Sequence, residues 1–133
     1  MTPVGPYSPI VRAGEWLVCS GQVGVRDGTL VQGGVEAEAR QALANLRALL
    51  DGEGSSMGAV VKTTVFLVDV AAFAAVNEVY AEAFGGHRPA RSTVVVAALP
   101  LGAAVEIEAW ARAVPTRSSG TGRSGTPPSA RSG

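Results

Sequence analysis

The sequence predicts one α+β domain, in which a mixed β-sheet is covered on one face by two helices. Two segments, residues 35–50 and 71–84, carry apolar side chains at helical spacing, and five short apolar or β-branched runs surround them. The order strand, strand, helix, strand, helix, strand, strand is typical of a sheet with both helices on one side. With 133 residues, 47% of them hydrophobic, the chain can build one compact core.

The first elements are expected to form a hairpin. Ser8 to Ala13 and Trp16 to Ser20 are strand-like runs joined by the two residues Gly14 and Glu15. The following stretch, Gly24 to Gly34, is rich in glycine and contains the pair Asp27-Gly28, which indicates a turn. No phosphate-binding GxxxxGK[ST] pattern occurs in it.

Two helices and a central strand come next. A helix is predicted from Val35 to Leu50, and Gly52 ends its apolar pattern. Val60 to Val70 is nearly all apolar or β-branched, as in a central strand. Ala71 to Phe84 should be the second helix, with one apolar stripe that we interpret as core packing. The stripe consists of Phe73, Val76, Val79 or Tyr80, and Phe84.

Ser92 to Ala98 and Val105 to Ala113 are the last two predicted strands, separated by a turn that contains Pro100 and Gly102. Residues 94–96 are consecutive valines. In the predicted strand from Val60, apolar residues occupy both alternating sets of positions, which suggests that both faces of the sheet are apolar. We therefore expect oligomerisation to cover the face that the helices leave open.

Charge and composition divide the chain into a domain at residues 1–114 and a tail at 115–133. The tail is built almost wholly of Ser, Gly, Pro, Thr and Arg, and we expect it to be disordered. Without its three arginines the domain carries a net charge of about −3, which argues against a nucleic-acid partner. The sequence has no signal pattern and no membrane-spanning apolar run, so we expect a soluble, cytoplasmic protein with no membrane partner.

Six separated motifs carry a family resemblance that runs in order from about Gly5 to Ala113. They are Gly5-Pro6-Tyr7-Ser8, Ser20-Gly21-Gln22, the segment 41–46 (QALANL), the segment 61–67 (VKTTVFL), Pro89-Ala90-Arg91-Ser92 and the segment 105–109 (VEIEA). Together they resemble the reactive intermediate deaminase (RidA, YjgF) family.

The resemblance implies a chorismate-mutase-like fold, in which three subunits close into a trimeric barrel with a pocket at each subunit interface. It also implies a 2-iminobutanoate/2-iminopropanoate deaminase type of hydrolase. Such enzymes convert 2-imino acids to 2-keto acids and ammonia without a cofactor.

The resemblance also assigns the site residues. Arg91 matches the arginine that binds the substrate carboxylate, Glu106 the first acid of the E-I-E motif, and Tyr7 the tyrosine of G-P-Y. Ser20 and Gly21 match the S-G-Q motif, whose backbone donors can support the carboxylate. Asn77 matches an asparagine often found near the pocket, although capping or interface packing explains it equally well.

The chemistry of these residues suits the reaction. A guanidinium offers a rigid, permanently charged fork to a carboxylate, and Glu106 can deprotonate the attacking water. Each residue also has a purely structural explanation. In that case Arg91 would pair with Glu82 or Glu106 at the surface, Glu106 would face solvent, and Tyr7 would anchor the N-terminal segment.

No catalytic metal is expected, because the chain has one histidine and its acids form no ligand pattern. That histidine, His87, is interpreted as a loop residue near the pocket rim. The single cysteine, Cys19, is interpreted as a small core residue and not a nucleophile.

Thr93, where many relatives have cysteine, and Pro9, where glutamine is common, leave the substrate range open. Three alternatives to a 2-iminobutanoate/2-iminopropanoate deaminase therefore remain. One is a non-catalytic module that binds a small carboxylate, and another is a pathway-specific deaminase for a different enamine. The third, an RNA-cleaving translation inhibitor, is the least favoured because the domain is acidic and lacks aromatic stacking platforms.

Overall fold

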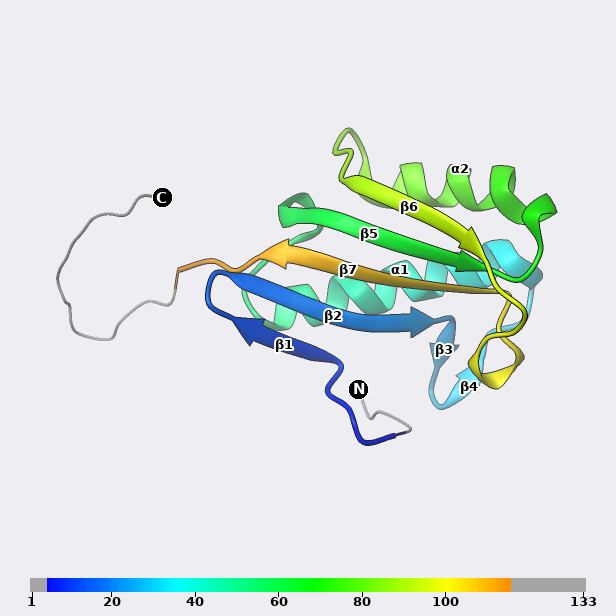
Figure 1. Cartoon of the computed structure of the whole chain (residues 1–133), viewed down its shortest axis with the longest axis horizontal. Helices are drawn as coiled ribbons and strands as arrows, with labels where there is room; N and C mark the ends of the chain where they lie inside the picture. The colour runs from blue at the N-terminus through cyan, green and yellow to red at the C-terminus, as the bar shows by residue number, and fades with distance from the viewer. Residues whose placement is uncertain (1–4, 116–133) are drawn as a thin grey trace, which may run out of the picture.

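The predicted order of elements is confirmed in a computed structural model that describes residues 5–115 (Figure 1). The strands and helices are β1 Ile10–Ala13, β2 Trp16–Val23, β3 Val25–Arg26, β4 Thr29–Leu30, α1 Gly34–Gly52, β5 Val60–Leu67, α2 Phe73–Phe84, β6 Ala90–Val95 and β7 Val105–Arg112. Short 3-10 turns lie at Met57–Ala59, Val70–Ala72 and Pro100–Gly102. The disordered tail predicted for 115–133 falls outside the described residues, apart from Pro115.

The main sheet has the order β1-β2-β7-β5-β6. Its only parallel pair within the described chain is β5 with β6, and the other neighbours are antiparallel. Both helices lie on the same face of this sheet, as Figure 1 shows. The α+β fold class, with a mixed sheet and two helices on one face, is therefore as predicted.

Several details of the elements differ from the prediction. The strand from Val60 ends at Leu67, because Asp69 accepts a hydrogen bond from the Ala71 N–H (2.9 Å) and starts a 3-10 turn. The strand predicted to begin at Ser92 already pairs at Ala90. The glycine-rich turn contains a small hairpin, β3–β4, whose turn residues Asp27 and Gly28 have positive φ angles of 55° and 81°.

The hydrophobic core lies between the sheet and the helices. Alternate strand residues point toward the helices, so Leu17 of β2, Leu67 of β5 and Ile107 of β7 are fully buried. Leu43 and Leu46 of α1 close the core from the helix side. Burial of this apolar surface is the main stabilising contribution to the fold.

Asn45, in the middle of α1, fixes the path of the chain from β2 into β3. Its side chain is buried, and Nδ2 donates to the carbonyl oxygens of Val23 (3.1 Å) and Val25 (3.0 Å). Gln41 donates in turn to Oδ1 of Asn45 (2.8 Å). The motif residues 41–46 thus hold the end of β2, which carries part of the predicted site.

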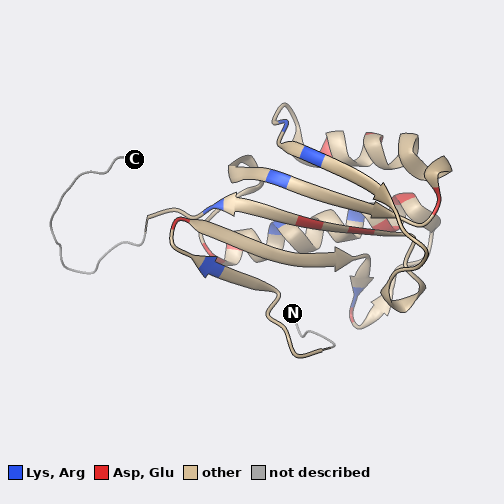
Figure 2. Ribbon diagram, in the orientation of Figure 1, with Lys and Arg blue, Asp and Glu red and all other residues tan. Residues whose placement is uncertain are grey.

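The uncovered face of the sheet is mixed and not purely apolar. Val11, Val94 and Trp110 expose 50%, 42% and 45% of their surface, and polar side chains lie among these apolar ones. Figure 2 shows acidic positions along β7. These are Glu106 and Glu108, which face away from the helices because their neighbours Val105, Ile107 and Ala109 are buried.

Within residues 5–115, neither helix combines the length and apolar character that a membrane span requires.

Candidate active site

Arg91 lies on the edge strand β6 and points toward the helix side of the sheet. Its register partner on β5 is Thr63, which is 1% exposed beneath α2. The guanidinium carbon of Arg91 is 4.8 Å from the centre of the Tyr80 ring and 5.7 Å from that of Phe73, both on α2. Arg91 is therefore a half-buried cation that rests on two aromatic side chains.

The two acids considered as partners of Arg91 are engaged elsewhere. Glu82 pairs with Arg40 of α1 at 3.4 Å, and Glu106 lies on the opposite face of the sheet. Among the described residues Arg91 enters no salt bridge. Its hydrogen-bond donors are thus available to an anion that the chain itself does not supply.

Asn77 lies on the same side of α2 as the two rings. It follows Phe73 by four residues and precedes Tyr80 by three, which places all three on one helix face. The side chain is half-buried. Helix spacing thus places Asn77 on the face of α2 that carries the two rings under Arg91, and its role near the substrate carboxylate stays a prediction.

Glu106 lies on the uncovered face of β7, opposite Phe66 of β5. Burial raises the pKa of its carboxyl group above the ordinary value, and the nearby negative charge of Glu108 raises it further. A carboxylate with a raised pKa is a stronger base once ionised. A half-buried carboxyl group with a raised pKa suits a general base, and this role of Glu106 stays a prediction.

A β-bulge in β2 creates the room for Glu106. Cys19 pairs with Ala109 and Gln22 with Ile107, so two residues of β2, Ser20 and Gly21, stand opposite one residue of β7. A side chain on Gly21 would collide with the Glu106 carboxylate, because its Cβ would lie 2.7 Å from Cδ. The missing side chain at position 21 is what lets Glu106 lie flat against the strand.

Ser20 holds the N-terminal segment in place. Its hydroxyl donates to the Ser8 carbonyl oxygen (2.6 Å), and its N–H donates to that of Pro9 (2.8 Å). Both donors are therefore engaged within the chain. They place Tyr7, which is 48% exposed, beside the bulge.

The predicted site residues thus form two groups on opposite faces of the sheet. Arg91 and Asn77 lie on the helix side, whereas Gly21 and Glu106 lie on the uncovered face, with Ser20 and Tyr7 beside them. Within one chain these groups do not enclose a common pocket.

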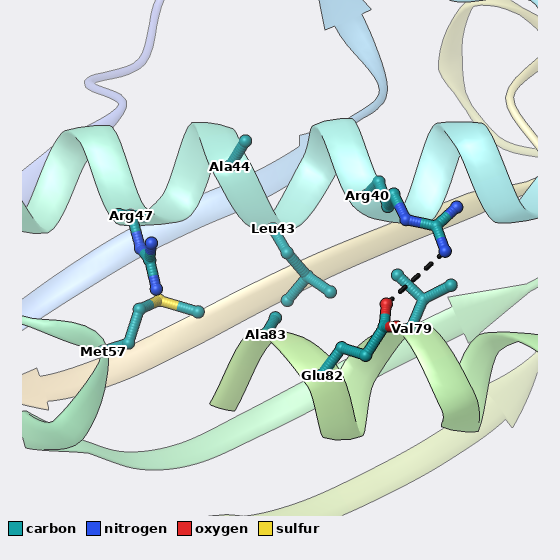
Figure 3. A pocket seen from close by; sticks show the side chains of 8 residues that line it. All are labelled: Arg40, Leu43, Ala44, Arg47, Met57, Val79, Glu82 and Ala83. Carbon is teal, nitrogen blue, oxygen red and sulfur yellow. Dashed lines mark hydrogen bonds and ion pairs between the residues drawn. The ribbon is translucent and has the colours of Figure 1, made fainter. Parts of the chain in front are cut away.

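A surface groove lies elsewhere, between α1 and α2 (Figure 3). It has a volume of about 270 Å³ and contains the ion pair of Arg40 with Glu82. It is lined by Arg40, Leu43, Ala44, Arg47, Met57, Val79, Glu82 and Ala83. None of the predicted site residues lines it, so we base the functional argument on the two side-chain groups.

Phe73, Tyr80 and Thr63 are the residues near the site that the sequence interpretation missed. The apolar stripe predicts that Phe73 is a core residue, but Phe73 is 43% exposed and lies against Arg91. Tyr80 is buried as expected, yet its ring also contacts Arg91. The spacing of Phe73, Asn77 and Tyr80 was visible in the sequence. The contact with Arg91 depends on how α2 packs over β6.

Cys19 and His87 have structural roles. Cys19 is 2% exposed, and burial raises the pKa of its thiol to about 11, which fits the predicted core residue. His87 is half-buried, and its Nε2–H donates to the Val60 carbonyl oxygen (2.6 Å). This bond ties the α2–β6 loop to the start of β5, four residues before Arg91 in the sequence.

Comparison with known proteins identifies the family. The sequence model of the family described as endoribonuclease L-PSP matches residues 1–113. The mouse 2-iminobutanoate/2-iminopropanoate deaminase is 50% identical over 110 residues, which cover 81% of this chain and 82% of the mouse protein.

Two solved structures share the fold. The yeast protein YEO7 is 40% identical with a TM-score of 0.83, over 85% of this chain and 91% of the yeast chain. Escherichia coli TdcF with bound serine is 38% identical with a TM-score of 0.80, over 84% of this chain and 91% of its own. The chain therefore belongs to the endoribonuclease L-PSP family, which is the YjgF/RidA family that its motifs resemble.

Proposed function

We propose that this protein hydrolyses reactive 2-imino acids and their enamine forms, such as 2-iminobutanoate and 2-iminopropanoate, to 2-keto acids and ammonia. One observation carries the proposal. Arg91 is a half-buried cation held on two aromatic rings, with no acid partner among the described residues. Such an arginine suits the carboxylate that every 2-imino acid carries. The relationship to the mouse deaminase supports the same reaction.

In the proposed mechanism Arg91 binds the substrate carboxylate through two parallel hydrogen bonds and orients the adjacent C=N carbon. Ionised Glu106 removes a proton from water, and the water oxygen bonds to that carbon. As the C–O bond forms, the electron pair of the C=N double bond moves to nitrogen, which takes the proton that Glu106 removed from water. The same carboxylate then transfers the hydroxyl proton of this adduct to nitrogen, and the C–N bond breaks as the C=O bond forms, which releases ammonia and the 2-keto acid. One water is consumed, and no electrons are exchanged with an external group.

This mechanism requires two copies of the chain. Arg91 and Glu106 lie on opposite faces of the sheet, so one copy must supply the arginine and a neighbour the carboxylate. We propose the homotrimer that the family resemblance implies. The half-exposed Val11, Val94 and Trp110 on the uncovered face are suited to burial between subunits.

The second candidate is a module that binds a small carboxylate without converting it. TdcF, a structural relative, was solved with bound serine, which carries a carboxylate next to an amino-bearing carbon. Arg91 would hold such a ligand in the same way. The two candidates differ only in turnover, which an assay can measure directly.

The test is release of 2-ketobutyrate from 2-iminobutanoate, generated in situ by a threonine dehydratase. We expect the wild-type protein to accelerate release above the uncatalysed background and Arg91→Ala to lose that acceleration. Arg47→Ala, which removes an exposed arginine from α1, is the charge-matched control and should remain active. If the wild type binds 2-ketobutyrate without acceleration, the binding module replaces the deaminase; if it does neither, both candidates are wrong.

A further inference from the structure

The side chain of Arg91 needs contacts that restrict its conformation if it is to bind a ligand tightly. It lies on an edge strand and has long, flexible side-chain bonds, and the described chain offers it no carboxylate. A guanidinium that is free to rotate would lose conformational entropy on binding a ligand, which weakens affinity. The closest support on the helix side is the ring of Tyr80, at 4.8 Å from the guanidinium carbon.

The Tyr80 side chain is held in turn by contacts with Thr63 on β5 and Phe84 on α2. Its hydroxyl lies 2.6 Å from Oγ1 of Thr63, within hydrogen-bond distance, and both residues are buried. Phe84, one turn further along α2, packs against the same ring with the ring centres 4.7 Å apart. Thr63 is also the register partner of Arg91, so the hydrogen bond ties the ring to the strand beside β6.

A ring that served only to fill the core would not need the hydroxyl. Burying a hydroxyl costs free energy unless it finds a partner, and phenylalanine would fill the same space without that cost. Burial also raises the pKa of Tyr80, so the hydroxyl stays protonated and able to bond with Thr63. The buried polar pair therefore lies where it can set the position of the ring under Arg91.

We infer that Tyr80 is a positioning residue, which uses its hydrogen bond to Thr63 to hold its ring as a platform that orients Arg91 toward the substrate carboxylate. This inference rests on the proposed role of Arg91 and adds the residue pair that prepares it for binding. Phe73, whose ring centre lies 5.7 Å from the guanidinium carbon, provides a second aromatic contact. The pair acts through Arg91 and does not contact the reacting atoms.

Tyr80→Leu removes the platform and tests the inference. We expect KM for 2-iminobutanoate, and the dissociation constant for 2-ketobutyrate used as a non-reacting probe, to rise roughly 3- to 30-fold. The value of kcat should change by less than about twofold, because Glu106 is untouched. Tyr80→Phe keeps the ring but loses the hydrogen bond to Thr63, so it should recover part of the affinity that Tyr80→Leu loses and remain weaker than the wild type.

Val79→Ala is the matched control for lost packing. Val79 is equally buried on α2, but it lines the groove toward α1 (Figure 3). It should lower the melting temperature without raising KM or the 2-ketobutyrate dissociation constant. If Tyr80→Leu and Val79→Ala give the same KM and the same affinity, Tyr80 is only a core residue and the inference is wrong.

Thr63→Val provides a second route if Tyr80→Leu does not fold. It keeps the shape of the side chain and removes the hydroxyl that anchors the ring. We expect weaker 2-ketobutyrate binding, by about twofold or more; wild-type affinity in both Thr63→Val and Tyr80→Phe would overturn the anchoring role. If the wild type itself neither hydrolyses the imine nor binds 2-ketobutyrate, the proposed function fails, and this inference fails with it.

Discussion

Glu106 and Glu108 place two carboxylates on one face of the same strand, separated by a single residue. Their strand alternates buried and half-buried residues, so both acids project from the uncovered face. The pKa of Glu106 is raised first by burial and second by the nearby negative charge of Glu108. At the residue scale, Glu108 therefore tunes the acid that we propose as the general base.

Glu108→Gln should lower the pKa of Glu106 by removing the repulsion. Since the proposed mechanism needs ionised Glu106, the acidic limb of the kcat/KM profile should move to lower pH. The measurement is the rate of imine hydrolysis above the uncatalysed background at each pH. An acidic limb that stays in place, or moves to higher pH, would contradict Glu106 as the base that Glu108 tunes.

The raised pKa of Glu106 also affects the stability of the folded protein, and this effect tests the pKa shift independently of activity. Because the folded-state pKa of Glu106 is raised, its neutral form favours folding below the unfolded-state pKa, and this contribution is lost as pH rises through the folded-state pKa. Glu106→Gln should therefore gain stability relative to the wild type across that rise. Thermal unfolding at a series of pH values measures the difference.

The β-bulge at Ser20 and Gly21 is the decisive feature at the scale of one element. It gives β2 an extra residue opposite β7, frees the position over which the Glu106 carboxylate lies, and carries the Ser20 bonds to the N-terminal segment. A regular strand would place a side chain against that carboxylate. The bulge therefore positions the acid and the Tyr7 segment together.

Gly21→Ala should reduce activity with little effect on folding. Its Cβ would meet the Glu106 carboxylate, the mobile end of a side chain, which can turn away at little cost. A displacement of about 1 Å can lower kcat on the order of 10²-fold. Gly52→Ala is the control, because a Cβ there meets nothing within 4 Å. A wild-type kcat in Gly21→Ala would contradict the proposed placement of Glu106.

At the scale of the whole molecule, the two faces of the sheet have different roles. The helix side holds Arg91 on its aromatic support, and the uncovered face holds Glu106. A single chain cannot bring the two together without disrupting the sheet. Assembly would therefore complete the site in the proposed mechanism and would also cover the exposed apolar side chains.

Mixing two inactive variants tests this arrangement. Arg91→Ala and Glu106→Gln should each be inactive alone. When they are co-expressed, some interfaces will combine an intact arginine from one subunit with an intact glutamate from its neighbour. Random assembly should restore about a quarter of the wild-type activity. Mixed oligomers that are seen by native mass spectrometry but remain inactive would show that each site lies within one chain.

Charge at this scale also bears on the RNA-cleaving alternative. The domain has a net charge of about −3, and the centre of the uncovered face carries Glu106 and Glu108 (Figure 2). Phosphate groups would meet repulsion there, whereas a small carboxylate needs only the single cation at Arg91. The charge pattern thus favours a small anionic substrate over RNA.

The sequence by itself determined the order of the main elements and the residues with chemical potential. Helical and alternating periodicities depend on local geometry, so the two helices and five main strands were predictable, as was Cys19 in the core. Alternation also predicted that Glu106 and Glu108 share a face. The chemistry of a lone arginine after a proline turn singled out Arg91, and the family motifs gave it a role.

Only the tertiary structure decided which face each residue occupies. Alternation relates neighbours within one strand, but the register between strands determines whether residues on different strands share a face. The pairing of β6 with β5 turned Arg91 toward α2, while the pairing of β7 left Glu106 on the other side. The contacts of Phe73 and Tyr80 with Arg91 join residues brought together by packing, and the pattern within a helix cannot specify them.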